Sequence, residues 1–190
     1  IFLMRRAGAT DEVIGYFNIA TLVFVLPNLL VGMAAPLLYN HWSKTLNSSG
    51  LLTTAKATIQ MAAALQGLSI LAIPMVSPVV GLVFGDAFQA AVTPTIVLLF
   101  AMAPLVFSRI ITPAFQGLGQ NFIITLSCIM RLATTGIILI LLPLTNYELL
   151  TWVGLSWVFG EFAALAVIAF GLALAARHDQ TERDERNSER

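Results

Sequence analysis

The sequence predicts an all-α membrane protein, a bundle of five full transmembrane helices preceded by a short helix stub. Of its 190 residues, 58% are hydrophobic and only 11% are charged, whereas a soluble domain carries about 25% charged residues. The apolar residues gather in runs of roughly 20 or more, the length at which a helix crosses the ~30 Å hydrocarbon core of a bilayer. Short polar connections separate these runs, so consecutive helices should be antiparallel neighbours.

Charge and cysteine content exclude several functional classes. The formal net charge is zero, which gives no electrostatic basis for a nucleic-acid partner. The single cysteine, Cys128, lies inside an apolar run, so no disulfide framework is possible. The main partner that the composition predicts is therefore the lipid bilayer.

The stub is residues 1–4, and it ends at Arg5-Arg6. A signal peptide would carry its charges before the apolar run, so we interpret the stub as the end of a preceding membrane helix. We accordingly expect the chain to be the C-terminal part of a longer protein. Spans are predicted at about 13–39, 58–84, 91–116, 121–143 and 149–176, followed by a charged tail at 177–190.

Clusters of polar residues mark the predicted connections between the spans and the C-terminal tail. Residues 40–57 form the longest predicted connection, with a turn at 47–50, and 85–88 form a tight connection into the third span. Acid-before-base pairs four residues apart allow the tail to extend the last helix into water, although we favour a solvated, partly disordered end over a binding role. The 40–57 connection and the tail lie on the same predicted side of the membrane, and this side carries more lysines and arginines than the other. The charge difference predicts a cytoplasmic C-terminus.

The third and fourth spans form a helical hairpin around the polar break at 117–121. Each arm carries one arginine: Arg109 lies nine residues before Leu118, and Arg131 lies ten residues after Asn121. At 1.5 Å of rise per residue, both lie roughly 14–15 Å from the break, near the bilayer midplane. Guanidinium groups at that depth must face protein, water or an anion.

Glu161, in the last span, lies at a similar depth and is the only carboxylate inside the predicted spans. One interpretation is a buried ion pair between Glu161 and one of the two arginines, tying the last helix to the hairpin. That leaves one arginine over. The other interpretation sends the surplus charge into a water-filled cavity, where an arginine can bind phosphate oxygens in a bidentate manner.

Polar side chains accompany these charges. Thr112 and Gln116 share the face of Arg109, while Asn28 and Gln66 lie on thin polar stripes of the first two spans. Such stripes indicate either a substrate path or hydrogen bonds between helices. The candidate cavity residues are Arg109, Arg131, Glu161, Asn28, Gln66 and Gln116.

Catalytic motifs are absent from the sequence. Both histidines lie outside the spans, and no HExxH, CxxC, GxSxG or phosphate-binding glycine loop occurs. Neither a carboxylate pair for acid–base work nor a metal cluster can be assembled from these residues. We therefore expect neither an enzyme nor a cofactor or metal site.

Several short motifs follow one another along about residues 1–172. They are Gly15-Tyr16-Phe17 with Ala20, Ala35-Pro36, Phe84-Gly85-Asp86-Ala87-Phe88-Gln89-Ala90-Ala91, Phe115-Gln116-Gly117-Leu118-Gly119-Gln120, Leu142-Pro143 and Glu161. In the order and spacing of these motifs, the chain resembles the C-terminal half of polysaccharide-biosynthesis membrane proteins, the Wzx-type flippases of lipid-linked oligosaccharides in the multidrug/oligosaccharidyl-lipid/polysaccharide exporter superfamily. One departure is the start of the last span, Tyr147 to Trp152, which replaces the usual glycine- and alanine-rich start.

The resemblance implies one lobe of a two-lobed transporter in the plasma membrane, working by alternating access. It implies an isoprenoid-diphosphate-linked oligosaccharide as substrate, a missing N-terminal lobe as partner, and a cytoplasmic C-terminus. Arg109 and Arg131 would hold the diphosphate, and Glu161 would tune one of them. Two alternatives stay open: a multidrug exporter with Glu161 as a cation-coupling carboxylate, and a non-transporting membrane scaffold of a glycan-assembly complex.

Overall fold

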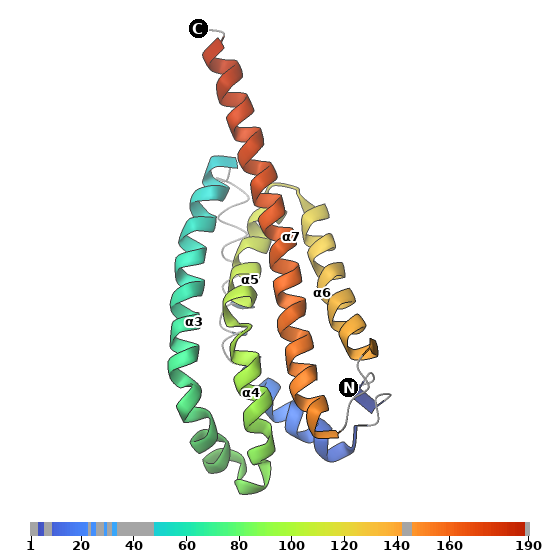
Figure 1. Cartoon of the computed structure of the whole chain (residues 1–190). Coiled ribbons are helices and arrows are strands. Elements are labelled where there is room, and N and C mark those ends of the chain that lie inside the picture. The colour runs from blue at the N-terminus through green and yellow to red at the C-terminus, as the bar shows by residue number, and fades with distance from the viewer. Residues whose placement is uncertain are drawn as a thin grey trace.

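The computed structural model describes residues 4–5, 9–22, 24–25, 29, 32–33, 48–141 and 146–188. All regular structure in these residues is helical (Figure 1). The elements are α3 (Ser48–Phe84), the 3₁₀ helix η1 (Asp86–Ala91), α4 (Val92–Leu99), α5 (Met102–Gly117), α6 (Asn121–Leu141) and α7 (Asn146–Ser188).

Three of these helices are long and apolar enough to cross a bilayer. The qualifying segments are Gly50–Phe84, Asn121–Leu141 and Leu149–Arg177. The pair α4 and α5 adds a fourth crossing if its two arms are counted as one bent span. Of the span expected at 13–39, residues 13–22 are helical, whereas residues 23, 26–28, 30–31 and 34–39 lie outside the described part of the chain, so a five-helix bundle is not established.

The second predicted span begins earlier than expected. It was placed at about residue 58, but α3 begins at Ser48, and Ser48–Gly50 are helical where a turn was predicted. Serine favours the first positions of a helix, and no proline interrupts residues 51–57. The polarity of this stretch was therefore wrongly interpreted as a loop; Asn47 lies outside the described residues.

The third predicted span is not one straight helix. It was expected at about 91–116, but it consists of α4 and α5, which are bent by 53° at the break between them. Phe100 and Ala101 form the break. Pro104 contributes to it, because a proline has no N–H to pair with the carbonyl four residues earlier, here that of Phe100.

Two glycines end helices in the left-handed region, where other residues are strained. Gly85 (φ 93°) follows α3, and Gly119 (φ 73°) lies in the predicted hairpin turn after α5. Around Gly119, the amide of Gln120 donates to the carbonyl of Phe115, and that of Gly119 donates to the carbonyl of Gln116. This is the Schellman pattern, which satisfies the carbonyls left free at a helix end.

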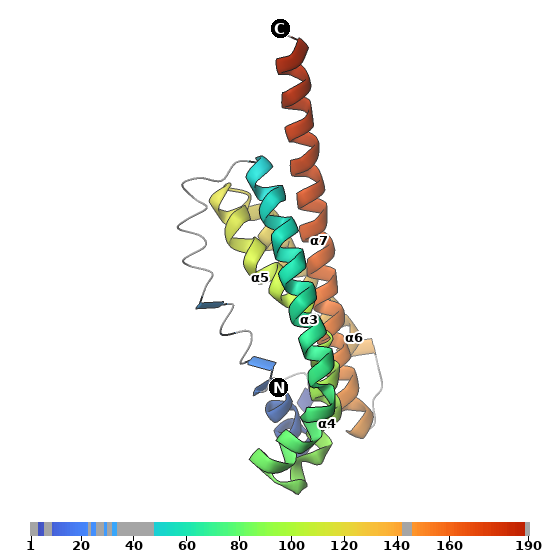
Figure 2. The same ribbon diagram turned by 90° about the vertical axis from the view of Figure 1, so that its left-hand side faces the viewer.

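Helix α5 is in contact with α3, α6 and α7 (Figures 1 and 2). Leu105, Ile111 and Phe115 on α5 are at most 1% exposed. By contrast, Leu71 and Leu82 on α3 are 76% and 88% exposed. An outward apolar face is what a helix in contact with lipid presents, which agrees with the composition and indicates a membrane-embedded protein.

The last helix is longer than its predicted span. α7 runs from Asn146 to Ser188, so the backbone of the charged tail is helical as far as Ser188. In Figure 1 this end of α7 extends past the other helices. Helix continuation agrees with the acid-before-base spacing of the tail.

Candidate functional site

Helices α6 and α7 approach each other closely at a row of small residues. Ser156, Gly160 and Ala164 recur every fourth residue on α7, and all three are buried. Thr135 on α6 donates its hydroxyl to the carbonyl of Ser156 at 3.2 Å. A Cβ on Gly160 would lie 3.0 Å from the carbonyl oxygen of Arg131 and would also collide with Thr135. Small residues at this spacing let helix backbones approach in membranes.

The close approach brings Arg131 and Glu161 into contact. Arg131 Nη2 lies 2.9 Å from Glu161 Oε2, and the side chains are 23% and 2% exposed. Arg131 Nη2 also donates to Ser108 Oγ on α5 at 3.3 Å. Trp157, one turn before Glu161, donates its indole N–H to Glu161 Oε1 at 3.4 Å. The cluster therefore links α5, α6 and α7 at a single depth.

Charge attraction, rather than complete hydrogen bonding, holds this cluster. The approach of Arg131 Nη2 to Glu161 Oε2 lacks hydrogen-bond geometry, and Arg131 Nε is buried without an acceptor among the described residues. Buried polar groups are usually satisfied, so unused capacity is a feature that needs an explanation. Arg131 Nε and Glu161 Oε2 can therefore still form hydrogen bonds with other groups.

Arg109 lies beside the cluster without joining it. It directly follows Ser108 on α5, its side chain is exposed, and its electrostatic attraction to Glu161 is weaker than that of Arg131. Within the described part of the chain, Arg109 has no hydrogen bond and no ion pair within 4.0 Å. Together, Arg109 and the Arg131–Glu161 ion pair therefore carry one net positive charge, which is on the exposed Arg109.

Arg109 belongs to a polar stripe along α5. Gln116 is exposed, and Thr112 is half-buried, while most other residues of α5 are buried. Arg109, Thr112 and Gln116 follow the i, i+3, i+7 spacing of one helix face, as expected from the sequence. Gln116 lies seven residues beyond Arg109, roughly 10 Å along the axis, so it shares the face of Arg109 but not the ion cluster.

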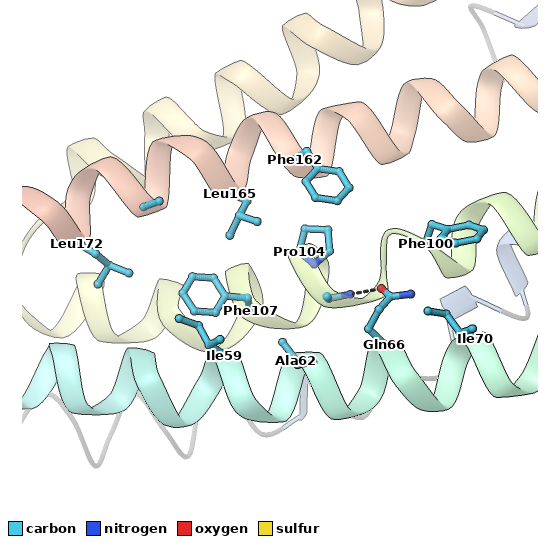
Figure 3. Close-up of a pocket in the computed structure, with 13 residues that line it drawn as sticks. Ile59, Ala62, Gln66, Ile70, Phe100, Pro104, Phe107, Phe162, Leu165 and Leu172 are labelled. Carbon is cyan, nitrogen blue, oxygen red and sulfur yellow. Dashed lines mark hydrogen bonds between the residues drawn. The ribbon is translucent and has the colours of Figure 1, made fainter.

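Gln66 lies in a different place, in a cavity of about 570 Å³ between α3, α5 and α7 (Figure 3). It is the one lining residue with a polar side chain. Its amide is hydrogen-bonded to the backbone at the break between α4 and α5. The cavity lining consists of Ile59, Ala62, Ala63, Gln66, Ile70, Phe100, Ala103, Pro104, Phe107, Phe162, Leu165, Ala169 and Leu172.

Of the six residues singled out from the sequence, the five that the structure describes lie in more than one place. Arg131 and Glu161 are paired, which is the ion-pair interpretation, and Arg109 is their exposed neighbour. Gln116 follows Arg109 along α5, and Gln66 lines the separate apolar cavity. Asn28 lies outside the described residues.

Sequence reasoning missed Ser108, Trp157 and Gly160 as members of the cluster. The sequence did contain local signals for Trp157 and Gly160. Trp157 precedes Glu161 by four residues, a spacing that places both on one helix face. Gly160 is the centre of the small-residue row on α7. Ser108 had no comparable signal, because its role depends on how α5 and α6 are rotated against each other.

Comparison with known proteins adds no family to this geometry. No protein-family model, no curated protein and no solved structure matches the chain. The residues that the structure describes contain no group of three or more histidine, cysteine, aspartate or glutamate side chains that could hold a metal ion.

Proposed function

We propose that this chain is one lobe of a membrane transporter that moves an isoprenoid-diphosphate-linked oligosaccharide across the plasma membrane, with Arg109 contacting the diphosphate. The observation that carries the proposal is the exposed Arg109 guanidinium beside an ion pair that already occupies Glu161.

The charge of Arg109 needs a partner that the described residues do not supply. A guanidinium facing hydrocarbon is costly, so an exposed arginine at this depth must face water or an anion. Its planar fork fits two phosphate oxygens at once and stays charged at every cellular pH. An anionic group that passes Arg109 on its way through the membrane meets both requirements.

The substrate class rests on the sequence resemblance to Wzx-type flippases. A lipid-linked diphosphate combines an anionic group with an isoprenoid chain that stays in the bilayer. Ser108 and Arg109 belong to the second arm of the bent α4–α5 span, and substrate sites of many transporters lie at discontinuous helices near the midplane. Rocking of this lobe against a second one would complete the alternating access.

The two alternatives from the sequence receive less support. A cation-coupled exporter would use Glu161, which already has Arg131 and Trp157 as partners, so a cation would have to displace Arg131 first. A scaffold without transport gives no reason for an exposed arginine at membrane depth. Both remain as outcomes of the experiment.

The test is transport by the full-length protein in vesicles that contain a fluorescent polyprenyl-diphosphate sugar. Arg109→Ala should lower the transport rate about 10- to 100-fold, the value of one lost charge-assisted hydrogen bond or pair of bonds at 1.4 kcal/mol per tenfold. Arg109→Lys should keep part of the rate, because the charge remains while the planar fork is lost.

The matched control is Arg5→Ala, which removes the same charge from an exposed arginine paired with Asp11 outside the cluster. It should transport like the wild type. Wild-type transport by Arg109→Ala would refute the role of Arg109. Drug efflux that depends on a cation gradient and on Glu161, without glycan transport, would favour the exporter instead.

A further inference from the structure

The side-chain amide of Gln66 occupies the place of one missing helical hydrogen bond. In an uninterrupted helix, the N–H of Ala103 would bond to the carbonyl of Leu99, four residues earlier. Here Ala103 N donates to Gln66 Oε1 at 3.0 Å, and Gln66 Nε2 donates to the carbonyl of Leu99 at 3.1 Å. The carboxamide is thus inserted between the two groups that would otherwise pair with each other.

The insertion coincides with the bend between α4 and α5. The two arms differ in direction by 53°. Across the break, Ala101 N bonds to the carbonyl of Leu98 at 2.9 Å, a tighter i→i−3 bond, and the regular pattern resumes with Leu105 N on Ala101 O. Side chains that enter the backbone ladder are a known cause of sharp kinks. Pro104 removes one ladder bond, and Gln66 replaces a second.

We propose that Gln66 is a removable wedge that holds the α4–α5 span in its bent state. When the carboxamide withdraws, the carbonyl of Leu99 and the N–H of Ala103 can bond to each other, so the backbone is hydrogen-bonded in both states. The withdrawn carboxamide has no side-chain partner in the cavity, because every other side chain that lines it is apolar (Figure 3). A stranded amide in apolar surroundings is costly, and this cost holds the bent state in the wild-type protein.

The wedge would set the position of the charged cluster. Ser108 and Arg109 lie on α5, seven and eight residues beyond Ala101 at the break, and Ser108 contacts Arg131 of α6. Helix α5 has 16 residues, a lever of ~24 Å, so each 10° change in bend moves its far end by ~4 Å. Withdrawal of the Gln66 amide from the break can therefore move Arg109, Thr112 and Gln116 relative to α6 and α7.

The test replaces Gln66 by methionine, which has a similar length but no amide, in the full-length protein carrying Cys128→Ser. Spin labels report distances between α3 and each arm of the bent span. One pair is at Lys56 and Gln116, and the other is at Leu82 and Thr93; all four side chains are exposed. The matched control is Ser69→Ala on α3, since Ser69 bonds only to its own helix at Leu65.

The proposal expects Gln66→Met to shift or split at least one of the two distance distributions by several ångström, while Ser69→Ala leaves both unchanged. Unchanged distances in Gln66→Met, whether or not the protein loses stability, would show a fixed break and overturn the proposal. Because the readout is a distance, this result is independent of which substrate is transported.

Discussion

The substitution Glu161→Gln removes the charge that faces Arg131 and keeps the shape of the side chain. It leaves Arg131, with 23% of its side chain exposed, as a largely buried cation without a counter-ion. Breaking one partner of a buried ion pair costs about 3–5 kcal/mol. The partial exposure of Arg131 and its bond to Ser108 favour the lower end, so we expect a loss of about 3 kcal/mol.

The companion variants make this a double-mutant cycle. Arg131→Met should also cost about 3 kcal/mol, because it leaves the Glu161 carboxylate, 2% exposed, without its cation. In the double variant no uncompensated charge remains, so its loss should be about as large as that of either single variant. The interaction energy is then about 3 kcal/mol, the upper end of the values found for contacting residues.

The assay is denaturant unfolding in detergent micelles, followed by tryptophan fluorescence, since Trp157 contacts Glu161. The exposed pair Arg5 and Asp11, at 3.0 Å and with side chains 66% and 87% exposed, is the control cycle. Exposed pairs contribute about 0–1 kcal/mol. If the Arg131–Glu161 interaction energy is as small as that of the control pair, the cluster does not hold α6 and α7 together.

Two further predictions concern glycines. Gly160→Ala should destabilise the protein by about 1–3 kcal/mol, because its Cβ would meet Thr135 and the carbonyl of Arg131. Gly136→Ala on α6, where a Cβ meets nothing within 4 Å, should instead be neutral or stabilising; equal losses at both positions in the unfolding assay would contradict the close approach. Gly119→Ala should cost about 1–2 kcal/mol, because φ is 73° there. An unchanged midpoint for this variant would mean that the turn does not need its left-handed residue.

Much of the fold could be predicted because it depends on local properties. Run length and hydropathy located α6 and the apolar part of α7, and Gly119 marked the hairpin turn. The depth of the charged residues also followed from counting, since rise per residue is fixed. Arg131 indeed reaches both Glu161 and Ser108. The start of α3 was missed because polar residues are compatible with both a loop and a helix end.

The break in the third span could be predicted only in part. Pro104 is visible in the sequence and weakens the helix at this point. The other half of the break comes from Gln66, which lies 33 residues before Leu99 and 37 before Ala103. No local pattern connects positions so far apart, so the sequence identified Gln66 as polar without indicating which groups it would meet.

The sequence alone predicted helices of membrane-spanning length that carry Arg109, Arg131 and Glu161 at similar depth, with one positive charge in excess. Only the tertiary structure decided that Arg131 forms the ion pair with Glu161 and that Arg109 stays exposed. The physical reason is rotation. Successive residues such as Ser108 and Arg109 point about 100° apart around a helix, and the packing of α5 against α6 and α7 selects which of them faces the ion pair.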